Sequence, residues 1–179
     1  FVDEYLKTSL PNVYAAGDCA TQYHRIKRRQ DYVPLGTHAN KQGRLAGANM
    51  AGEKSAFEGI VGTAILRVLQ LEMARTGLNE KEAEELGLSF DSVTVETRHR
   101  AGYYPDSQKQ TVKLIYEKGS GRLLGGQVMG YAVDKPIDIL ATALYAGLTV
   151  SDLEALDLAY APPFSSVWSP VQQAARRSR

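Results

Sequence analysis

Two short segments combine tyrosine with prolines that stiffen the backbone around it. Residues 101–105 carry Tyr103 and Tyr104, and residues 159–164 carry Tyr160. Stiff neighbours place a phenol hydroxyl at low entropic cost, and such a hydroxyl can donate a proton to a developing thiolate or polarise a sulfur substrate. Tyrosine also favours protein interfaces, and composition alone favours an aromatic dimer contact over chemistry.

Asp18 is the second candidate, because it follows Gly17 directly after a short apolar run, residues 13–16. We predict that this run is a buried strand. A carboxylate at the end of a strand suits a ligand rich in hydroxyls, since it accepts hydrogen bonds from ribose or ribityl groups beside a helix N-terminus. The alternative is a capping role, in which the carboxylate only satisfies backbone N–H groups of the next turn.

The remaining reactive side chains predict neither a catalytic triad nor a metal site. His24, His38 and His99 are scattered, and no Ser-His-Asp arrangement follows from their spacing. The lone Cys19 excludes an internal disulfide, a CxxC pair and a cysteine zinc cluster. Its neighbouring carboxylate disfavours a thiolate, so we predict a packing cysteine. The Gly-Ser-Gly sequence at 119–121 lies between expected strands and predicts a turn rather than a dinucleotide loop.

Helices and strands must position these residues, and periodicity indicates where they lie. Helical patterns cover residues 37–50, 60–74, 79–86, 136–147, 151–154 and 170–176. Alternating patterns rich in Val and Thr predict strands at 90–98, 111–117 and 122–131, with a hairpin turn at 118–121. Residues 60–74 also fit a half-buried extended run, but Ile65, Leu69 and Met73 recur at helical spacing and favour a helix.

Local signals refine these elements. Asn79 with Glu82, and Ser151 with Glu154, form two expected capping boxes.

The basic run at 24–29 predicts a solvated loop rather than a phosphate site. Helices followed by antiparallel strands and further helices predict an α+β fold.

Length and composition bound the function. The 179 residues hold one domain, or one domain and part of another, and the linker at 53–55 suggests a boundary between residues 1–55 and residues 56–179. The net charge of +1 argues against a dedicated nucleic-acid binder, and the longest apolar stretch, 137–150, is too short to span a bilayer. The composition fits a reducing interior, so we predict a cytoplasmic protein.

The start of the chain suggests that more sequence precedes it. Residue 1 is Phe1, and nothing ahead of the expected strand at 13–16 supplies the neighbours that a buried strand needs. We therefore expect the chain to begin inside a domain. The alternative is a processed or cloned terminus on a complete domain.

Three segments resemble the pyridine nucleotide-disulfide oxidoreductases. Residues 8–20, with Ala-Ala-Gly-Asp at their centre, resemble the second flavin-binding motif of that superfamily, and residues 34–44 resemble the helix that follows it. Residues 159–165, Ala-Tyr-Ala-Pro-Pro-Phe-Ser, and residues 102–105, Gly-Tyr-Tyr-Pro, are similar to the branch of coenzyme A-disulfide reductases, NADH oxidases and persulfide reductases. The resemblance covers essentially the whole chain.

This resemblance implies a homodimeric FAD enzyme, in which NAD(P)H reduces the flavin and the flavin reduces a single cysteine upstream of residue 1. The chain would then be the tail of the FAD-binding domain plus the dimerisation domain, and inactive alone. Gly17 and Asp18 would bind the flavin ribityl chain. Tyr103 and Tyr160 would reach the partner subunit's cysteine, with Tyr104 the rival to Tyr103. A further set, Pro34, Leu35, Gly36 and Thr37, would approach the flavin ring.

Some properties stay open at this stage. The resemblance leaves coenzyme A disulfide, persulfide, polysulfide and dioxygen as acceptors, and NADH or NADPH as donor. The chain departs from the pattern of this family at Ser169, where relatives usually carry aspartate. A further alternative is a non-catalytic dimerisation module of an NADH oxidase, whose tyrosines only pack.

Overall fold

The computed structural model describes residues 1–178, which form two compact units that divide between Gly62 and Thr63. The linker at 53–55, where the sequence places the boundary, lies within the first unit. No helix among the described residues is long and apolar enough to cross a membrane.

The first unit is built around one long helix. Its elements are the 3₁₀ helix η1 (Gly17–Cys19), strands β1 (Gln22–His24) and β2 (Arg29–Asp31), and helix α1 (Gly36–Met50). Val2, Leu6, Ala20 and Ala46 form its buried apolar cluster. The helix ends as the sequence predicts, because Gly52 adopts a left-handed φ of 101°.

The structure tests two predictions in this unit, and one of them is wrong. Residues 13–16 are not a buried strand: Tyr14 forms one isolated bridge with Lys7, and Val13 is 42% exposed. Backbone bonds join this run to Leu6 and Thr8, but no strand of the described residues includes it. The basic run at 24–29 does contain a loop, since residues 25–28 form the turn that joins β1 to β2 in an antiparallel hairpin.

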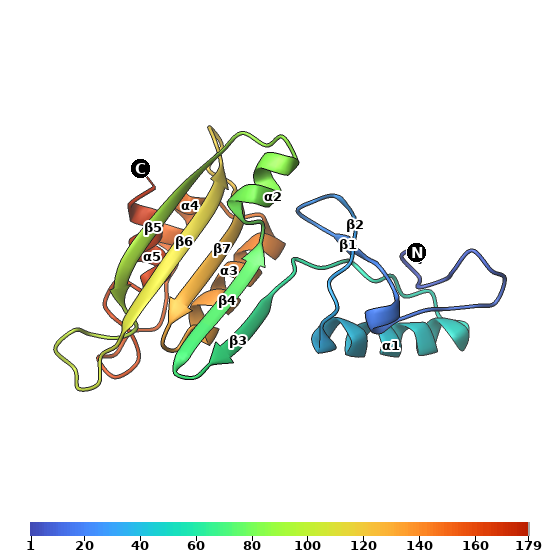
Figure 1. Cartoon of the computed structure of the whole chain (residues 1–179), viewed down its shortest axis with the longest axis horizontal. Helices are drawn as coiled ribbons and strands as arrows, with labels where there is room; N and C mark the ends of the chain where they lie inside the picture. The colour runs from blue at the N-terminus through green and yellow to red at the C-terminus, as the bar shows by residue number, and fades with distance from the viewer. Residues whose placement is uncertain (179) are drawn as a thin grey trace. The chain divides into compact units, whose positions relative to one another are not determined.

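The second unit is an antiparallel sheet with helices, which confirms the predicted α+β class (Figure 1). Its strands are β3 (Ala64–Val68), β4 (Leu71–Gly77), β5 (Phe90–Arg98), β6 (Lys109–Glu117) and β7 (Leu123–Gly130). They lie in the order β3-β4-β7-β6-β5. Its helices are α2 (Glu80–Glu85), α3 (Asp134–Ala146), α4 (Val150–Ala155) and α5 (Pro170–Arg176).

The helices α3, α4 and α5 cover one face of this sheet (Figure 1). Alternation along the strands sends Val112, Leu114 and Val128 into the buried layer, where Leu140 and Val171 are also buried. The strand at 90–98, the turn at 118–121 and the helix ending at Gly147 follow the sequence predictions. This layer gives the loops at the sheet ends a rigid base.

The predicted helix at 60–74 is wrong, because these residues enter a β-hairpin. Strands β3 and β4 pair antiparallel, with Val68 opposite Leu71, and Leu69 takes a left-handed φ of 54° in the turn. The helical spacing of Ile65, Leu69 and Met73 arises by coincidence, since cross-strand pairing overrides so short a pattern.

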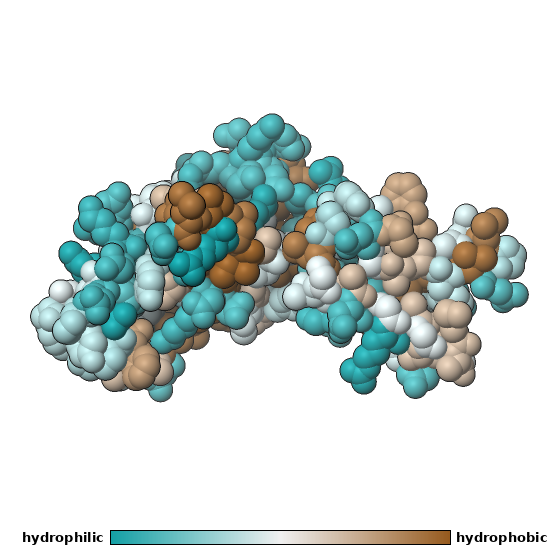
Figure 2. Space-filling view, turned by 60° about the horizontal axis from the view of Figure 1, so that its bottom comes forward, coloured by the Kyte–Doolittle hydropathy of each residue, from teal (hydrophilic) through white to brown (hydrophobic). Residues whose placement is uncertain are grey.

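The hairpin leaves apolar side chains exposed at the sheet edge. Leu66, Val68 and Leu71 are 42–54% exposed, and Leu69 is 88% exposed. Figure 2 shows brown side chains gathered on the second unit, over the part where Figure 1 draws β3 and β4. Clustered apolar exposure of this kind marks an interaction surface.

Capping boxes begin the short helices. Asn79 and Glu82 cap α2 as predicted. The box on α4, however, joins Thr149 to Asp152 rather than Ser151 to Glu154. Thr149 has the extended backbone that a capping residue needs, whereas Ser151 already lies inside the helix.

Candidate functional site

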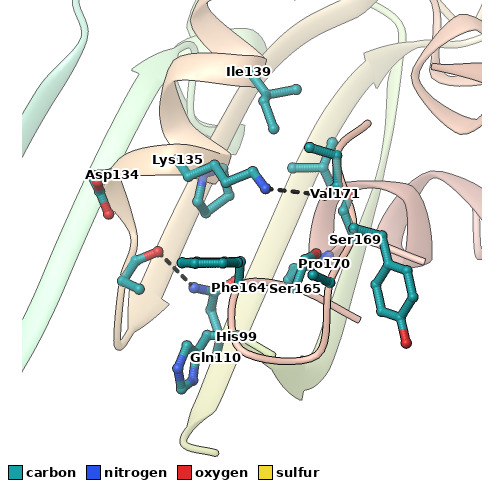
Figure 3. Close-up of a pocket in the computed structure, with 15 residues that line it drawn as sticks. His99, Gln110, Asp134, Lys135, Ile139, Phe164, Ser165, Ser169, Pro170 and Val171 are labelled. Atoms are coloured by element: carbon teal, nitrogen blue, oxygen red, sulfur yellow. Dashed lines mark hydrogen bonds between the residues drawn. The ribbon is translucent and has the colours of Figure 1, made fainter. Parts of the chain in front are cut away.

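A cavity of about 470 Å³ lies in the second unit, at the end of the sheet from which the tyrosine loops emerge. Its walls include His99, Gln110, Lys135, Tyr160, Phe164 and Val171. Figure 3 shows the Gln110 side chain beside the Phe164 ring, with Lys135 entering from α3. The wall is therefore mostly apolar, with a few polar groups fixed in place.

Hydrogen bonds hold the polar wall in position. Gln110 Nε2 donates to the carbonyl oxygens of Tyr131 and Ala132, at 2.6 and 3.1 Å. Lys135 Nζ donates to Ala159 O at 3.4 Å, which connects α3 to the loop that carries Tyr160 (Figure 3). The lysine bond therefore joins the loop of Tyr160 to α3, while the Gln110 bonds hold the segment between β7 and α3.

The structure brings Tyr103 and Tyr160 together, although they come from distant parts of the sequence. Their phenol groups lie close enough to interact, and this interaction is the largest cause that raises the pKa of Tyr160 above its usual 10.0. Both side chains are open to solvent, at 78% and 45% exposure. The pair therefore presents two phenol groups to solvent, and the raised pKa keeps the Tyr160 hydroxyl protonated at neutral pH.

Tyr104 does not join this pair. The guanidinium carbon of Arg100 lies 5.6 Å from the centre of its ring, a cation–π contact that holds it within its own loop. Geometry thus distinguishes Tyr103 from Tyr104, where sequence spacing left both open.

Residues 159–164 form an irregular loop, as the two prolines predict. Phe164 N and Ser165 N both donate to Ala161 O, which closes a turn that leaves Phe164 74% exposed. The loop therefore holds Tyr160 in place while an aromatic ring remains open for a further contact.

In the first unit, Asp18 lies exposed within η1, which packs on α1. Gly17 N donates to Gln42 Oε1 at 2.7 Å, and a Cβ at Gly17 would lie 3.1 Å from Ala39 Cβ. Gly17 also adopts a left-handed φ of 80°, which favours glycine. This position therefore has two reasons to carry glycine.

The N-terminus of α1 lies open beside η1. Leu35 is the N-cap residue, and no side chain caps the helix. Gly36 and Thr37 are exposed, and a Cβ at Gly36 would meet nothing within 4 Å. Uncapped N–H groups and the helix dipole suit an acceptor atom of a ligand. Pro34, also exposed, precedes this turn.

The packing role predicted for Cys19 is wrong, because its side chain is exposed. Its sulfur contacts Ala16 O at 3.3 Å. The 3₁₀ turn points Cys19 outward, whereas a continued strand would have alternated it inward. Among the described residues no group of three or more His, Cys, Asp or Glu could hold a metal ion.

The sequence analysis assigned no role to two further residues near these sites. His99 is buried beside the Tyr103 loop, and its only sequence signal is its place directly after a predicted strand. Gln42 is fully buried and bonds Gly17, but its Nε2 has no hydrogen-bond partner. It lines a second cavity of about 610 Å³, whose walls do not include Asp18 or residues 34–37.

Comparison with known proteins identifies the class. Residues 63–171 match the family model "Pyridine nucleotide-disulphide oxidoreductase, dimerisation domain". This match covers more than half of the chain. The chain therefore belongs to the pyridine nucleotide-disulphide oxidoreductases, and its second unit contains their dimerisation domain.

Particular relatives indicate the branch of the family that the chain resembles. The chain is 40% identical over 176 residues to the NAD(P)H coenzyme A polysulfide/persulfide reductase of Pyrococcus horikoshii, covering 98% of this chain and 40% of that protein. It is 34% identical to an NADH oxidase of Enterococcus faecalis, covering 94% and 38%.

A solved structure agrees. The NAD-dependent persulfide reductase from A. fulgidus superposes with a TM-score of 0.95 at 43% identity, covering 99% of this chain and 33% of that one. The chain thus spans about 40% of the length of the curated relatives that it matches. The predicted resemblance to this branch is confirmed.

Proposed function

We propose that the chain is the C-terminal portion of a homodimeric flavoenzyme that uses NAD(P)H to reduce coenzyme A disulfide or a related sulfur substrate through a cysteine outside this chain. Residues 1–55 would be the tail of its FAD-binding domain and residues 56–179 its dimerisation domain. The paired phenols of Tyr103 and Tyr160 are the observation that carries this proposal.

The first unit fits a flavin. Asp18 offers an exposed carboxylate for ribityl hydroxyls, and the uncapped start of α1 offers N–H groups to a ring oxygen. Gln42 fixes the Gly17 backbone, so the carboxylate is presented from a held turn. When bound, FAD would carry electrons from NAD(P)H to the sulfur centre.

The tyrosines would act on the proton that sulfur chemistry requires. Reductive cleavage of a disulfide releases a thiolate, which is stabilised when a neighbouring hydroxyl donates a hydrogen bond or a proton to it. Tyr160 holds its proton at neutral pH, since the neighbouring Tyr103 raises its pKa above 10.0. Tyr103 would in turn orient the Tyr160 hydroxyl. Both hydroxyls face solvent in one protomer, so a partner subunit has access to them.

The second candidate is a dioxygen-reducing NADH oxidase. The similarity to the E. faecalis NADH oxidase favours it, because that protein aligns over almost the same residues. In this case the tyrosines would only pack in the dimer. The two functions differ in whether NADH consumption by the full-length protein depends on coenzyme A disulfide or on dioxygen.

The test replaces each phenol in the full-length protein that carries this chain. Tyr103→Phe and Tyr160→Phe should each lower kcat for disulfide reduction by roughly ten-fold or more, as expected when a positioned proton donor is removed. Tyr116→Phe is the matched control, since it loses only a hydroxyl bonded to Ser178 O at 3.2 Å. Unchanged reduction in intact dimeric variants would show that the tyrosines only pack.

A further inference from the structure

The loop of residues 99–108 joins β5 to β6 and carries Tyr103. Its two ends meet at His99 and Gln108, where His99 N donates to Gln108 O at 3.2 Å. The backbone of Gln108 also meets the imidazole: Gln108 N donates to Nδ1 at 3.1 Å, and Gln108 O lies 3.3 Å from Nδ1. His99 therefore closes the neck of the loop with its backbone and its side chain together.

The other imidazole nitrogen also faces a donor. Arg100 Nε donates to His99 Nε2 at 2.6 Å, just as Gln108 N donates to Nδ1. A neutral ring has one bare nitrogen and accepts one of these two bonds, whereas a protonated ring accepts neither. Arg100 also lies over the Tyr104 ring, which connects the imidazole to the neighbour of Tyr103.

The surroundings favour this neutral ring. His99 is only 7% exposed, and the Tyr131 ring lies 4.8 Å from it. Burial is the largest cause that lowers its pKa below 6.5, with the Arg100 charge acting in the same direction. The ionisable groups around it are Glu72 of β4, whose charge acts the other way, Arg100, Tyr131, Asp134 and Lys135 of α3, and Tyr160.

We propose that His99 is a positioning residue, which holds the Tyr103 loop against Tyr160 while its imidazole is neutral and releases the loop when it is protonated. A proton on Nε2 removes the acceptor of the Arg100 bond and places two positive charges 2.6 Å apart. The neck then opens, and the tyrosine pair separates. The positioning role itself does not depend on the proposed function. Only its effect on disulfide reduction does.

The test follows the tyrosine pair itself in the 179-residue chain. NMR of the chain with ring-labelled tyrosine, assigned with Tyr103→Phe and Tyr160→Phe, detects a cross-peak between the two rings. In the unsubstituted chain this cross-peak should be lost as the pH falls below 6.5 through the titration of His99. The imidazole titration is recorded in the same samples.

Two substitutions separate the positioning role from mere folding. His99→Asn keeps a donor near Gln108 O but cannot gain a proton, so its cross-peak should persist at every pH. His99→Ala should lack the cross-peak throughout. A persistent cross-peak in His99→Ala would overturn the positioning role, and so would a cross-peak in the unsubstituted chain that survives imidazole protonation. If His99→Ala does not fold, the comparison of the unsubstituted chain with His99→Asn still decides.

The outcomes for the two proposals are distinct. If the phenylalanine variants reduce disulfide normally while the cross-peak responds to pH as expected, the proposed chemistry fails and the His99 role stands. If activity requires the phenols but the cross-peak ignores pH, the His99 role fails alone.

Discussion

At Gly125, in the second unit, the neighbouring backbone leaves no room for any side chain. It lies in β7 where the strand passes the backbone of Leu78, and a Cβ there would come within 2.0 Å of Leu78 O and 2.5 Å of Leu78 N. The backbone cannot yield as a flexible side chain would. The close approach follows from the bond between Leu78 N and Leu124 O, which connects the end of β4 to β7.

Gly125→Ala should therefore lower the free energy of unfolding by about 2–3 kcal/mol, because overpacking forces the backbone apart. Urea denaturation followed by circular dichroism measures this change. Gly102→Ala is the control, since its Cβ would meet only the Arg98 side chain at 3.5 Å. A control shift beyond roughly 0.5 kcal/mol, or equal shifts in the two variants, would contradict the argument.

At the scale of elements, short helices depend on their caps. Helix α4 has six residues, too few to be stable alone, so its capping box contributes much of its local order. The backbone N–H and hydroxyl of Thr149 both bond the Asp152 carboxylate, at 2.8 and 2.7 Å. These bonds lower the pKa of Asp152 below 3.8, since they favour the charged carboxylate.

The lowered pKa gives a definite sign to the acid response. The contribution of Asp152 to stability is present above pH 3.8 and is lost as the pH falls through the lower folded-state pKa. Unfolding measured at a series of acid pH values should therefore show a shallower decline for Asp152→Asn than for the unsubstituted chain. Asp157→Asn, outside the box, should leave the decline unchanged. Identical curves for all three chains would rule out this cap.

At the scale of the whole molecule, the exposed aromatic loop and the apolar hairpin edge explain why a dimerisation domain should not remain single. Phe164, Val167 and Trp168 are all open to solvent, as are the apolar side chains of β3. Surfaces of this kind are normally covered in an assembly. The proposed homodimer would cover at least part of them.

The isolated 179-residue chain should sediment as a dimer and yet be inactive. It should bind FAD weakly and show no NADH turnover when mixed with both, because it carries only part of the proposed flavin site and Cys19 does not match the expected redox cysteine. Flavin fluorescence and NADH absorbance measure these properties. Tight flavin binding with turnover would contradict the proposed division of the enzyme, and a monomer at micromolar concentration would contradict the dimer.

The sequence determined the elements whose signals are local. The strand at 90–98, the Asn79 capping box and the Gly147 helix end depend on alternation, on a side chain three residues away and on a left-handed backbone. The motif residues also indicated the family without any coordinates. Each of these properties is written within a few neighbouring residues, so it survives whatever the rest of the chain does.

Only the tertiary structure decided the properties that depend on distant partners. The segment at 60–74 forms strands because β4 pairs with β7, which no local pattern reveals. Tyr103 was distinguished from Tyr104 by contacts with Tyr160 and Arg100. His99 gained its place at the loop neck from a strand register that brings Gln108 opposite it. Long-range pairing and burial fix these features, and both exist only once the chain has folded.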